Sequence, residues 1–199
     1  MNKPWYKLKI DTSHALVNPW PLVPQNPDQD QLWSCPQELI FTKEWMNYIQ
    51  NLGLTFISKS MVFYRNPNYS TQYAHVDVDK VNDPDFNNET SLQHYGINWV
   101  LKGKGSSMVW YNTPDEKYQI SYTKANTPYI NFKVETLNEI DRCYIQLEPV
   151  LVRVDIPHNI SIGNEERWCI SARFFNHVKE PSWDTVVELF RSKNLLIEH

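Results

Sequence analysis

Two stretches of the sequence carry side chains that could bind a metal ion together. Residues 71–80, TQYAHVDVDK, place a histidine and an aspartate two positions apart, His75 and Asp77. Residues 157–174, PHNISIGNEERWCISARF, add His158 and, nine positions later, Arg167. Residues two apart in a β-strand point to the same face, so His75 and Asp77 could reach one ion. Alone this pair is a weak signal, because about 0.7 His-x-acid matches arise by chance in such a composition.

The three side chains would form an open ligand set. Two imidazoles and one carboxylate leave coordination positions free, which is typical of non-haem Fe(II) that binds both O2 and a co-substrate. Zinc with the same ligands would favour hydrolysis. We therefore predict a metal site formed by His75, Asp77 and His158.

The stretch RWCISARF has the alternation of a β-strand. One face carries Arg167, Cys169, Ser171 and Arg173, and the apolar residues between them form the other face. If the first face turns inward, its arginines need anionic partners, because an unpaired buried charge is very costly. A dicarboxylate ligand could supply one through two parallel hydrogen bonds. The alternatives are a solvated outer face and, for Arg173, an ion pair with an acid on a neighbouring strand.

The order His-x-Asp, distal His, then Arg resembles the Fe(II)/2-oxoglutarate-dependent dioxygenases over about residues 60–175. The interval from His158 to Arg167 is similar to that of the prolyl hydroxylases. The stretch GINWVLKG…MVWY resembles a small phage- and bacteria-type subgroup and the aspartyl/asparaginyl hydroxylase-like proteins. The resemblance implies a mainly β fold, a double-stranded β-helix (jelly roll) with flanking α-helices.

The resemblance also implies roles for individual residues. Fe(II) would sit on His75, Asp77 and His158, and 2-oxoglutarate would bind the iron while its far carboxylate pairs with Arg167. With O2, the products would be succinate, CO2 and a hydroxylated amino acid, peptide side chain or small metabolite. Plant-type enzymes often have Ser where this chain has Cys169, so the second 2-oxoglutarate contact stays open. The candidates for further co-substrate or substrate contacts are Ser171, Asn98, Tyr111, Tyr73 and Arg173.

The remaining pattern predicts the elements that position these residues. We expect one domain over 1–199, with an irregular N-terminal wrap over 1–34, a helix over 36–52, a β core over 60–176 and a C-terminal helix over 182–195. The glycines of KGKGSS, residues 102–107, predict a hairpin turn. Two long insertions, 80–93 and about 113–142, are predicted to be surface or binding loops.

Composition narrows the partners. The 199 residues carry a formal net charge of −4, and no run of basic residues stands out. This charge balance disfavours binding to nucleic acid, so we expect a small-molecule or peptide substrate. Cys35, Cys143 and Cys169 lack metal-ligand spacing and indicate free thiols. Without a signal-peptide or membrane-spanning pattern, we expect a cytoplasmic protein.

Three other readings stay open. The chain could be a non-catalytic β-barrel binding protein, or a cupin-like metalloenzyme that uses zinc or manganese. Within the dioxygenases, the Arg-x5-Arg spacing of Arg167 and Arg173 also resembles nucleic-acid demethylases. The acidic charge balance and the short interval after His158 weigh against that branch.

Overall fold

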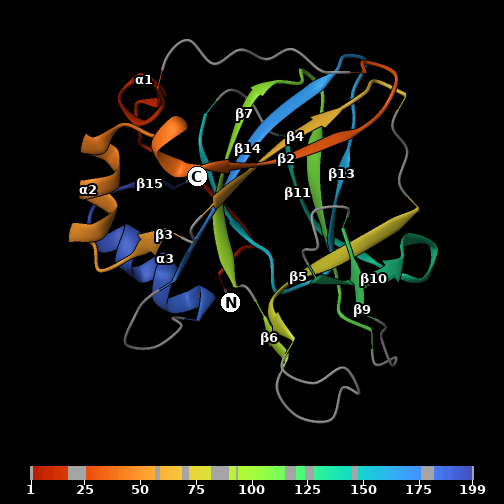
Figure 1. Cartoon of the computed structure of the whole chain (residues 1–199). Coiled ribbons are helices and arrows are strands. Elements are labelled where there is room, and N and C mark those ends of the chain that lie inside the picture. Colours follow the sequence, from red (N-terminus) through yellow and green to blue (C-terminus); the bar gives the residue numbers. More distant parts are fainter. Residues whose placement is uncertain are drawn as a thin grey trace.

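Two antiparallel β-sheets face each other in the computed structural model, which describes residues 2–17, 26–56, 59–68, 72–81, 90–92, 94–114, 120–123, 128–144, 148–175 and 182–198 (Figure 1). The first sheet has the order β15-β1-β12-β7-β14-β4-β2, and β3 also pairs with β14. The second has the order β11-β8-β13-β5-β10-β9, and β6 also pairs with β5. The expectation of a mainly β protein is confirmed.

The bounds of the strands follow from this pairing. The first sheet contains β1 (Trp5–Leu8), β2 (Gln31–Pro36), β3 (Thr55–Phe56), β4 (Lys59–Arg65), β7 (Tyr95–Lys102), β12 (Val150–Arg153), β14 (Arg167–Phe175) and β15 (Leu196–Ile197). The second contains β5 (Tyr73–Val81), β6 (Thr90–Leu92), β8 (Ser107–Tyr111), β9 (Ile120–Tyr122), β10 (Pro128–Lys133), β11 (Glu139–Tyr144) and β13 (His158–Ser161).

Helices cover the outer face of the first sheet, away from the second (Figure 1). They are α1 (Thr12–Ala15), α2 (Lys43–Asn51) and α3 (Trp183–Ser192), and the 3-10 turn η1 (Gln37–Leu39) precedes α2. A second 3-10 turn, η2 (Val134–Thr136), packs through Val134 on the second sheet. Ile49 of α2 and Phe190 of α3 are fully buried in one cluster with Trp99 of β7 and Trp168 of β14. No helix of the described chain is long and apolar enough to cross a membrane.

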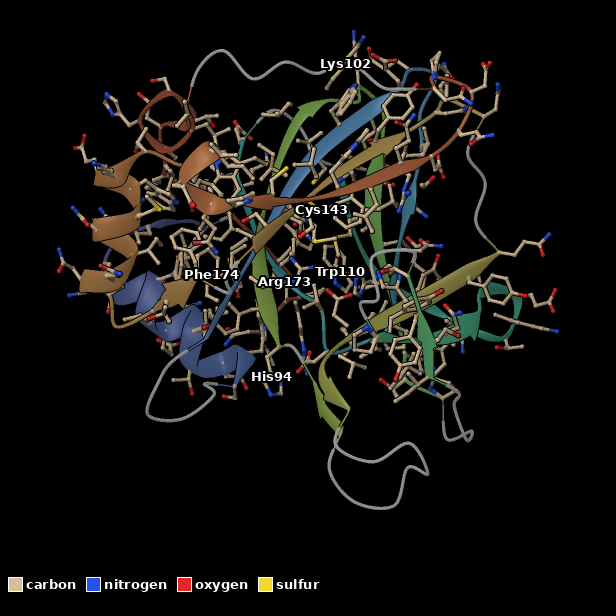
Figure 2. The ribbon with its side chains drawn as sticks, in the orientation of Figure 1. His94, Lys102, Trp110, Cys143, Arg173 and Phe174 are labelled. Atoms are coloured by element: carbon tan, nitrogen blue, oxygen red, sulfur yellow. The ribbon has the colours of Figure 1, made fainter. Side chains whose placement is uncertain are left out.

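A second apolar cluster fills the space between the sheets. It joins Val100 and Cys169 of the first sheet to Met108, Trp110 and Cys143 of the second. β14 therefore contributes alternate residues to two cores, as its sequence pattern predicts. Figure 2 shows the same alternation: Arg173 lies between the sheets, and its neighbour Phe174 lies toward the helices. The three cysteines are unpaired, and two of them serve as small core residues.

The N-terminal part is more regular than expected. Within residues 1–34 the structure has β1, α1 and most of β2, which pairs with β4. The helix predicted over 36–52 begins only at Lys43, because Pro36 ends β2 and Thr42 Oγ1 accepts a hydrogen bond from Trp45 N at 3.1 Å. The C-terminal helix is confirmed, with Ser182 as its cap, but it ends at Ser192.

The prediction of a hairpin at 102–107 is wrong. Gly103 and Gly105 do take positive φ values of 136° and 79°, as a tight turn requires. However, β7 pairs with β12 and β14, whereas β8 pairs with β11 and β13. The turn therefore carries the chain from one sheet to the other.

The two predicted loop insertions contain ordered strands. The segment 113–142 supplies β9, β10, η2 and most of β11, so it extends the second sheet and is not one long loop. In the segment 80–93, β5 continues through Val81 and pairs with β6. Residues 82–89 and 93 lie outside the described residues.

Candidate metal centre

Strands β5 and β13 bring the three predicted ligands together. The register of the pair sets His158 directly opposite His75, and their ring centroids are 4.3 Å apart. Asp77 lies two residues after His75 on the same face, with Oδ1 3.5 Å from His75 Nε2. One potential ligand atom from each of the three residues lies within 4.8 Å of the others. Such a spacing suits atoms that surround one ion.

The ring of His158 is fixed by the backbone. Its Nδ1 lies 2.9 Å from the carbonyl oxygen of Ile156, which can only accept, so Nδ1 carries the proton and Nε2 has the free lone pair. The residue is 3% exposed. Burial lowers its pKa below the ordinary value, despite the opposing charge of Asp77. His158 is therefore a neutral imidazole whose ligand atom is already oriented.

His75 is also neutral but faces solvent on one side. Burial and then the neighbouring His158 lower its pKa, and the cations Arg65 and Arg173 act in the same direction. Its side chain nevertheless keeps 38% of its surface exposed. An ion held here could be approached from the His75 side.

Arg173 joins the two sheets at this centre. Its Nε and Nη2 donate to the same oxygen of Asp77, Oδ2, at 3.1 and 2.5 Å. Burial, the largest single cause, raises the pKa of Asp77, but the charge and hydrogen bonds of Arg173 together with the neighbouring His158 and His75 outweigh it and lower that pKa to about 2. Asp77 is thus held ionised, with Oδ2 engaged and Oδ1 turned toward His75.

The residues Ser171 and Asn98 support Arg173. Arg173 Nη1 donates to Ser171 Oγ, which donates to Asn98 Oδ1 at 2.6 Å. Both residues are buried. Three of the residues predicted to contact a co-substrate or substrate therefore form one chain of hydrogen bonds that ends on the metal-ligand carboxylate. The structure therefore contains the ion pair between Arg173 and an acid on another strand that was one of the two alternatives for this residue.

A glycine makes room for this arginine. Gly96 lies opposite Arg173 in the register of β7 and β14. A Cβ atom at position 96 would overlap Arg173 Nη1 and lie 2.7 Å from the carbonyl oxygen of Ala172. Sequence reasoning missed this residue, although a glycine inside a strand is a signal of close approach.

Arg167 is buried in a different way. It is 2% exposed, and its Nε and Nη2 have no hydrogen-bond partner in the described part of the chain. Its strand neighbour in the register is another arginine, Arg65, which pairs with Asp30 at 3.7 Å. The aliphatic part of Arg167 packs on Gly103, where a Cβ would lie 2.8 Å from Arg167 Cγ. Unlike Arg173, Arg167 has no anionic partner within the described residues.

The two tyrosines predicted as co-substrate contacts are not part of this hydrogen-bonded chain. Tyr111 packs with Ala74 and Val109 on the outer face of the second sheet, and its hydroxyl donates to Asn159 Oδ1 at 3.2 Å. The sequence could not show this, because the face of each residue depends on which sheet β8 joins. Tyr73 does share the His75 face and is 46% exposed.

A second charged cluster was not predicted. His94 Nδ1 lies 2.7 Å from Asp155 Oδ2, and Arg153 Nε lies 2.5 Å from Asp155 Oδ1. Burial raises the pKa of Asp155, but its bonds to His94 and Arg153 outweigh burial and lower it. Its backbone neighbour Val154 accepts a hydrogen bond from Asp77 N at 3.0 Å. The cluster thus lies one residue from Val154, whose carbonyl oxygen holds the backbone of Asp77.

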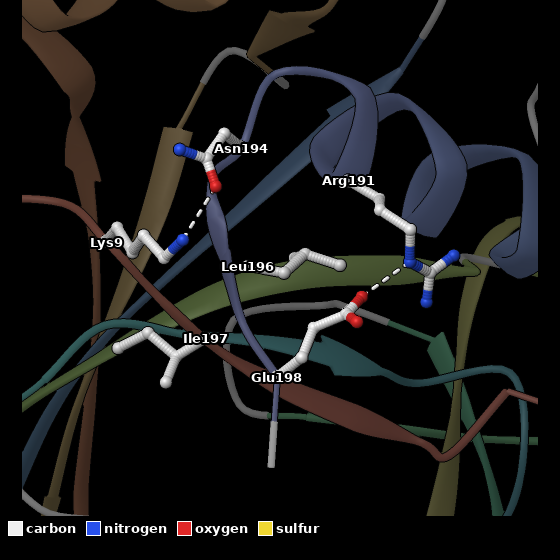
Figure 3. A pocket seen from close by; sticks show the side chains of 6 residues that line it. All are labelled: Lys9, Arg191, Asn194, Leu196, Ile197 and Glu198. Atoms are coloured by element: carbon white, nitrogen blue, oxygen red, sulfur yellow. Dashed lines mark hydrogen bonds and ion pairs between the residues drawn. The ribbon is translucent and has the colours of Figure 1, made fainter.

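A shallow hollow of about 400 Å³ lies elsewhere, beside β15 (Figure 3). Its two cations are already paired, Lys9 with Asn194 and Arg191 with Glu198. It includes none of the metal-centre residues.

No protein-family model matches this chain, and no curated protein sequence matches it. The function must therefore be argued from the geometry of the chain itself.

Proposed function

We propose that this protein is an Fe(II)- and 2-oxoglutarate-dependent oxygenase that hydroxylates an amino acid, a peptide side chain or a small metabolite. The observation that carries the proposal is a convergent His75, Asp77 and His158 site in a fold that also buries Arg167, for which the described residues supply no anionic partner. A buried unpaired charge costs several kcal/mol, so the chain tolerates Arg167 best if an anion binds there. A carboxylate of a dicarboxylic acid fits that requirement.

The pairing of strands supports a jelly roll as the fold. Take the eight core strands in chain order: β4, β5, β7, β8, β11, β12, β13 and β14. The first pairs with the last, the second with the seventh, the third with the sixth and the fourth with the fifth. A long antiparallel ribbon rolled into two facing sheets has this pairing. The resemblance noted in the sequence implies the same fold.

The donor set fits iron. Two neutral imidazoles and an ionised carboxylate, with the His75 side exposed, match the ligands that open Fe(II) sites use. Iron, when bound, would supply O2 chemistry in which 2-oxoglutarate is oxidised to succinate and CO2 while one oxygen atom enters a C–H bond of the substrate.

The chain's own residues would hold and shield these reactants. Arg167 would bind the far carboxylate of 2-oxoglutarate, and Arg173 would keep Asp77 ionised and oriented. The apolar cluster around Val100, Met108 and Cys169 would exclude water from the space between the sheets. The substrate would approach from the exposed side of His75.

The test needs no substrate. Fe(II) and then 2-oxoglutarate are added anaerobically to the purified protein, and the weak visible metal-to-ligand charge-transfer band is recorded. We expect the band in the wild type and in His94→Ala, a histidine outside the ligand set, and its loss in His75→Ala. Bound iron without the band would favour a zinc or manganese cupin-like enzyme. Failure to bind iron would favour a non-catalytic binding protein.

A further inference from the structure

Strand β10 extends the second sheet beyond the metal ligands. In its register with β5, Asn131 lies opposite His75 and Tyr129 lies opposite Asp77. On the next strand, Ser121 lies opposite Tyr129. Opposed residues of an antiparallel pair share a face, so these side chains and the metal ligands project to the same side. We call Tyr73, Tyr129, Asn131 and Ser121 the β10 surface.

The β10 surface is close to the metal centre and partly open. The ring of Tyr129 meets the ring of His75 edge-on, with centroids 6.1 Å apart. The Cβ atoms of Asn131 and His75, as an opposed pair, lie about 4.5–5.5 Å apart. Tyr73 is 46% exposed, and Tyr129, Asn131 and Ser121 are partly exposed. A molecule placed over the exposed side of His75 would therefore touch this surface.

The surface offers aromatic and amide groups, and one cation, Lys133, lies opposite Tyr73 on the same face. The Asn131 amide has one hydrogen bond within the described residues, a long one of 3.4 Å from Nδ2 to Ser121 Oγ. An amide side chain presents an acceptor and donors in one plane, which complements another planar amide. The exposed ring of Tyr73 offers a flat apolar contact. Together these groups suit a peptide-like molecule.

The charges around the surface disfavour a substrate that carries a cationic group. Within the paired stretches 73–77 of β5, Pro128–Lys133 of β10 and Ile120–Tyr122 of β9, Asp77 is the one carboxylate. Arg65 and Arg173 both act on His75 as positive charges. With a divalent metal and the 2-oxoglutarate dianion bound, the metal, Asp77, 2-oxoglutarate, Arg167 and Arg173 together carry a net charge of about +1. Lys133 opposite Tyr73 adds a further positive charge, so a cationic group would be repelled.

We propose that the β10 surface binds the substrate and that this substrate is a neutral or acidic peptide-like molecule whose planar amide pairs with Asn131 and packs on Tyr73. The inference rests on the proposed oxygenase function. The substrate must lie on the face of β10, not along the sheet edge. A strand added at β9 would lie about 14 Å from β5, three strand spacings away, and so would not reach the metal.

The test compares tyrosines on the two faces of one sheet. Tyr73→Ala and Asn131→Ala alter the β10 surface. Tyr122→Ala is the matched control, because Tyr122 is 53% exposed but shares the outer face with Ile120, which packs on Val76 and Ile130. All three variants are first required to give the anaerobic Fe(II)/2-oxoglutarate band, which tests the oxygenase function separately.

Substrate binding is then measured as succinate formed above the substrate-free rate. The probes are N-acetylated, C-amidated tripeptides with each amino acid at the centre, and a single-stranded oligonucleotide. We expect neutral or acidic peptides to stimulate succinate formation and peptides with a central Lys or Arg to stimulate it little. Of the three variants, only Tyr73→Ala and Asn131→Ala should lose this stimulation, by at least tenfold. Equal stimulation in these variants and in Tyr122→Ala would overturn the surface assignment. With the band present, stimulation by the oligonucleotide alone, or by no peptide, would overturn the substrate class.

Discussion

The guanidinium of Arg173, on one sheet, holds Oδ2 of Asp77, on the other, through two hydrogen bonds. The pair is one of the few charged contacts that cross between the sheets in the described chain, and it lies at the centre that can hold a metal. It fixes the carboxylate so that a single oxygen, Oδ1, points toward His75. Arg173 would therefore position Asp77 for a metal ion bound at this centre.

Arg173→Gln should weaken metal binding without abolishing it. The three ligands remain, but Asp77 loses the group that orients it, and loss of such a supporting contact typically costs about 10–100-fold in metal affinity. Titration with Fe(II) or Co(II) measures the change. Arg153→Gln is the control, because it breaks a similar ion pair at Asp155 outside the ligand set. Equal weakening in both variants would contradict a specific role for Arg173.

Gly96→Ala should reproduce the Arg173 defect. The added methyl group overlaps Arg173 Nη1 and must displace the guanidinium, since the carbonyl of Ala172 blocks the other side. We expect lower metal affinity and a loss of about 1–3 kcal/mol in unfolding free energy. Gly53→Ala is the control: its φ of 77° strains any side chain, but nothing lies within 4 Å. It should lose stability and keep metal affinity.

Arg167→Met should make the ligand-free protein more stable. Replacing a buried ionic group by an apolar one of similar length can gain about 1–4 kcal/mol. Added 2-oxoglutarate should stabilise the wild type in thermal unfolding and leave Arg167→Met unchanged. Arg142→Met is the control, because Arg142 already pairs with Glu139, so its loss should bring no gain. A destabilised Arg167→Met would mean that Arg167 has a structural partner.

Tyr111→Phe should not affect the metal centre. The variant loses one hydrogen bond to Asn159, worth about 1 kcal/mol of stability, on the outer face of the second sheet. Calorimetry and the Fe(II)/2-oxoglutarate band measure the two effects separately. A weakened band would show that the two faces of the sheet are coupled.

Acidification should destabilise the metal-free protein. The pKa of His75 falls from 6.5 to about 3 on folding, so below pH 6.5 the unfolded chain takes up a proton that the folded chain does not. The stabilisation from the neutral ring is complete above pH 6.5 and declines as the pH falls toward 3. Denaturant midpoints at pH 7.5, 6.5 and 5.5 should fall less steeply in His75→Gln. His14→Gln, at a side chain that is 79% exposed, should retain the wild-type slope.

Local periodicity predicted the shared face of His75 and Asp77 and the two faces of β14, because both depend on a two-residue repeat within one strand. His158 lies on another strand, β13, and was included from the order and spacing of the motif. The C-terminal helix was also predictable from its cap and apolar spacing. The partner of Arg173 was not, since Asp77 lies 96 residues away and only sheet pairing brings them together. The same holds for Asn131, in a segment that was expected to be a loop. The start of α2 was missed because Pro36 still belongs to β2 and Gln37–Leu39 form the separate 3-10 turn η1.

Because β14 is buried on both faces, an insertion or deletion within this strand would have large effects. Trp168 and Ile170 fill one core, and Arg167 and Arg173 face the other side. Inserting or deleting a single residue between the two arginines would move one of them to the helix-covered face and a large apolar side chain toward Asp77. The change would also disturb the pairing with β4, whose register is continuous over residues 167–171, whereas β7 already has one register shift between Trp168 and Cys169. The even spacing of Arg167 and Arg173 in the chain is therefore what keeps both guanidiniums on the face that turns away from the helices.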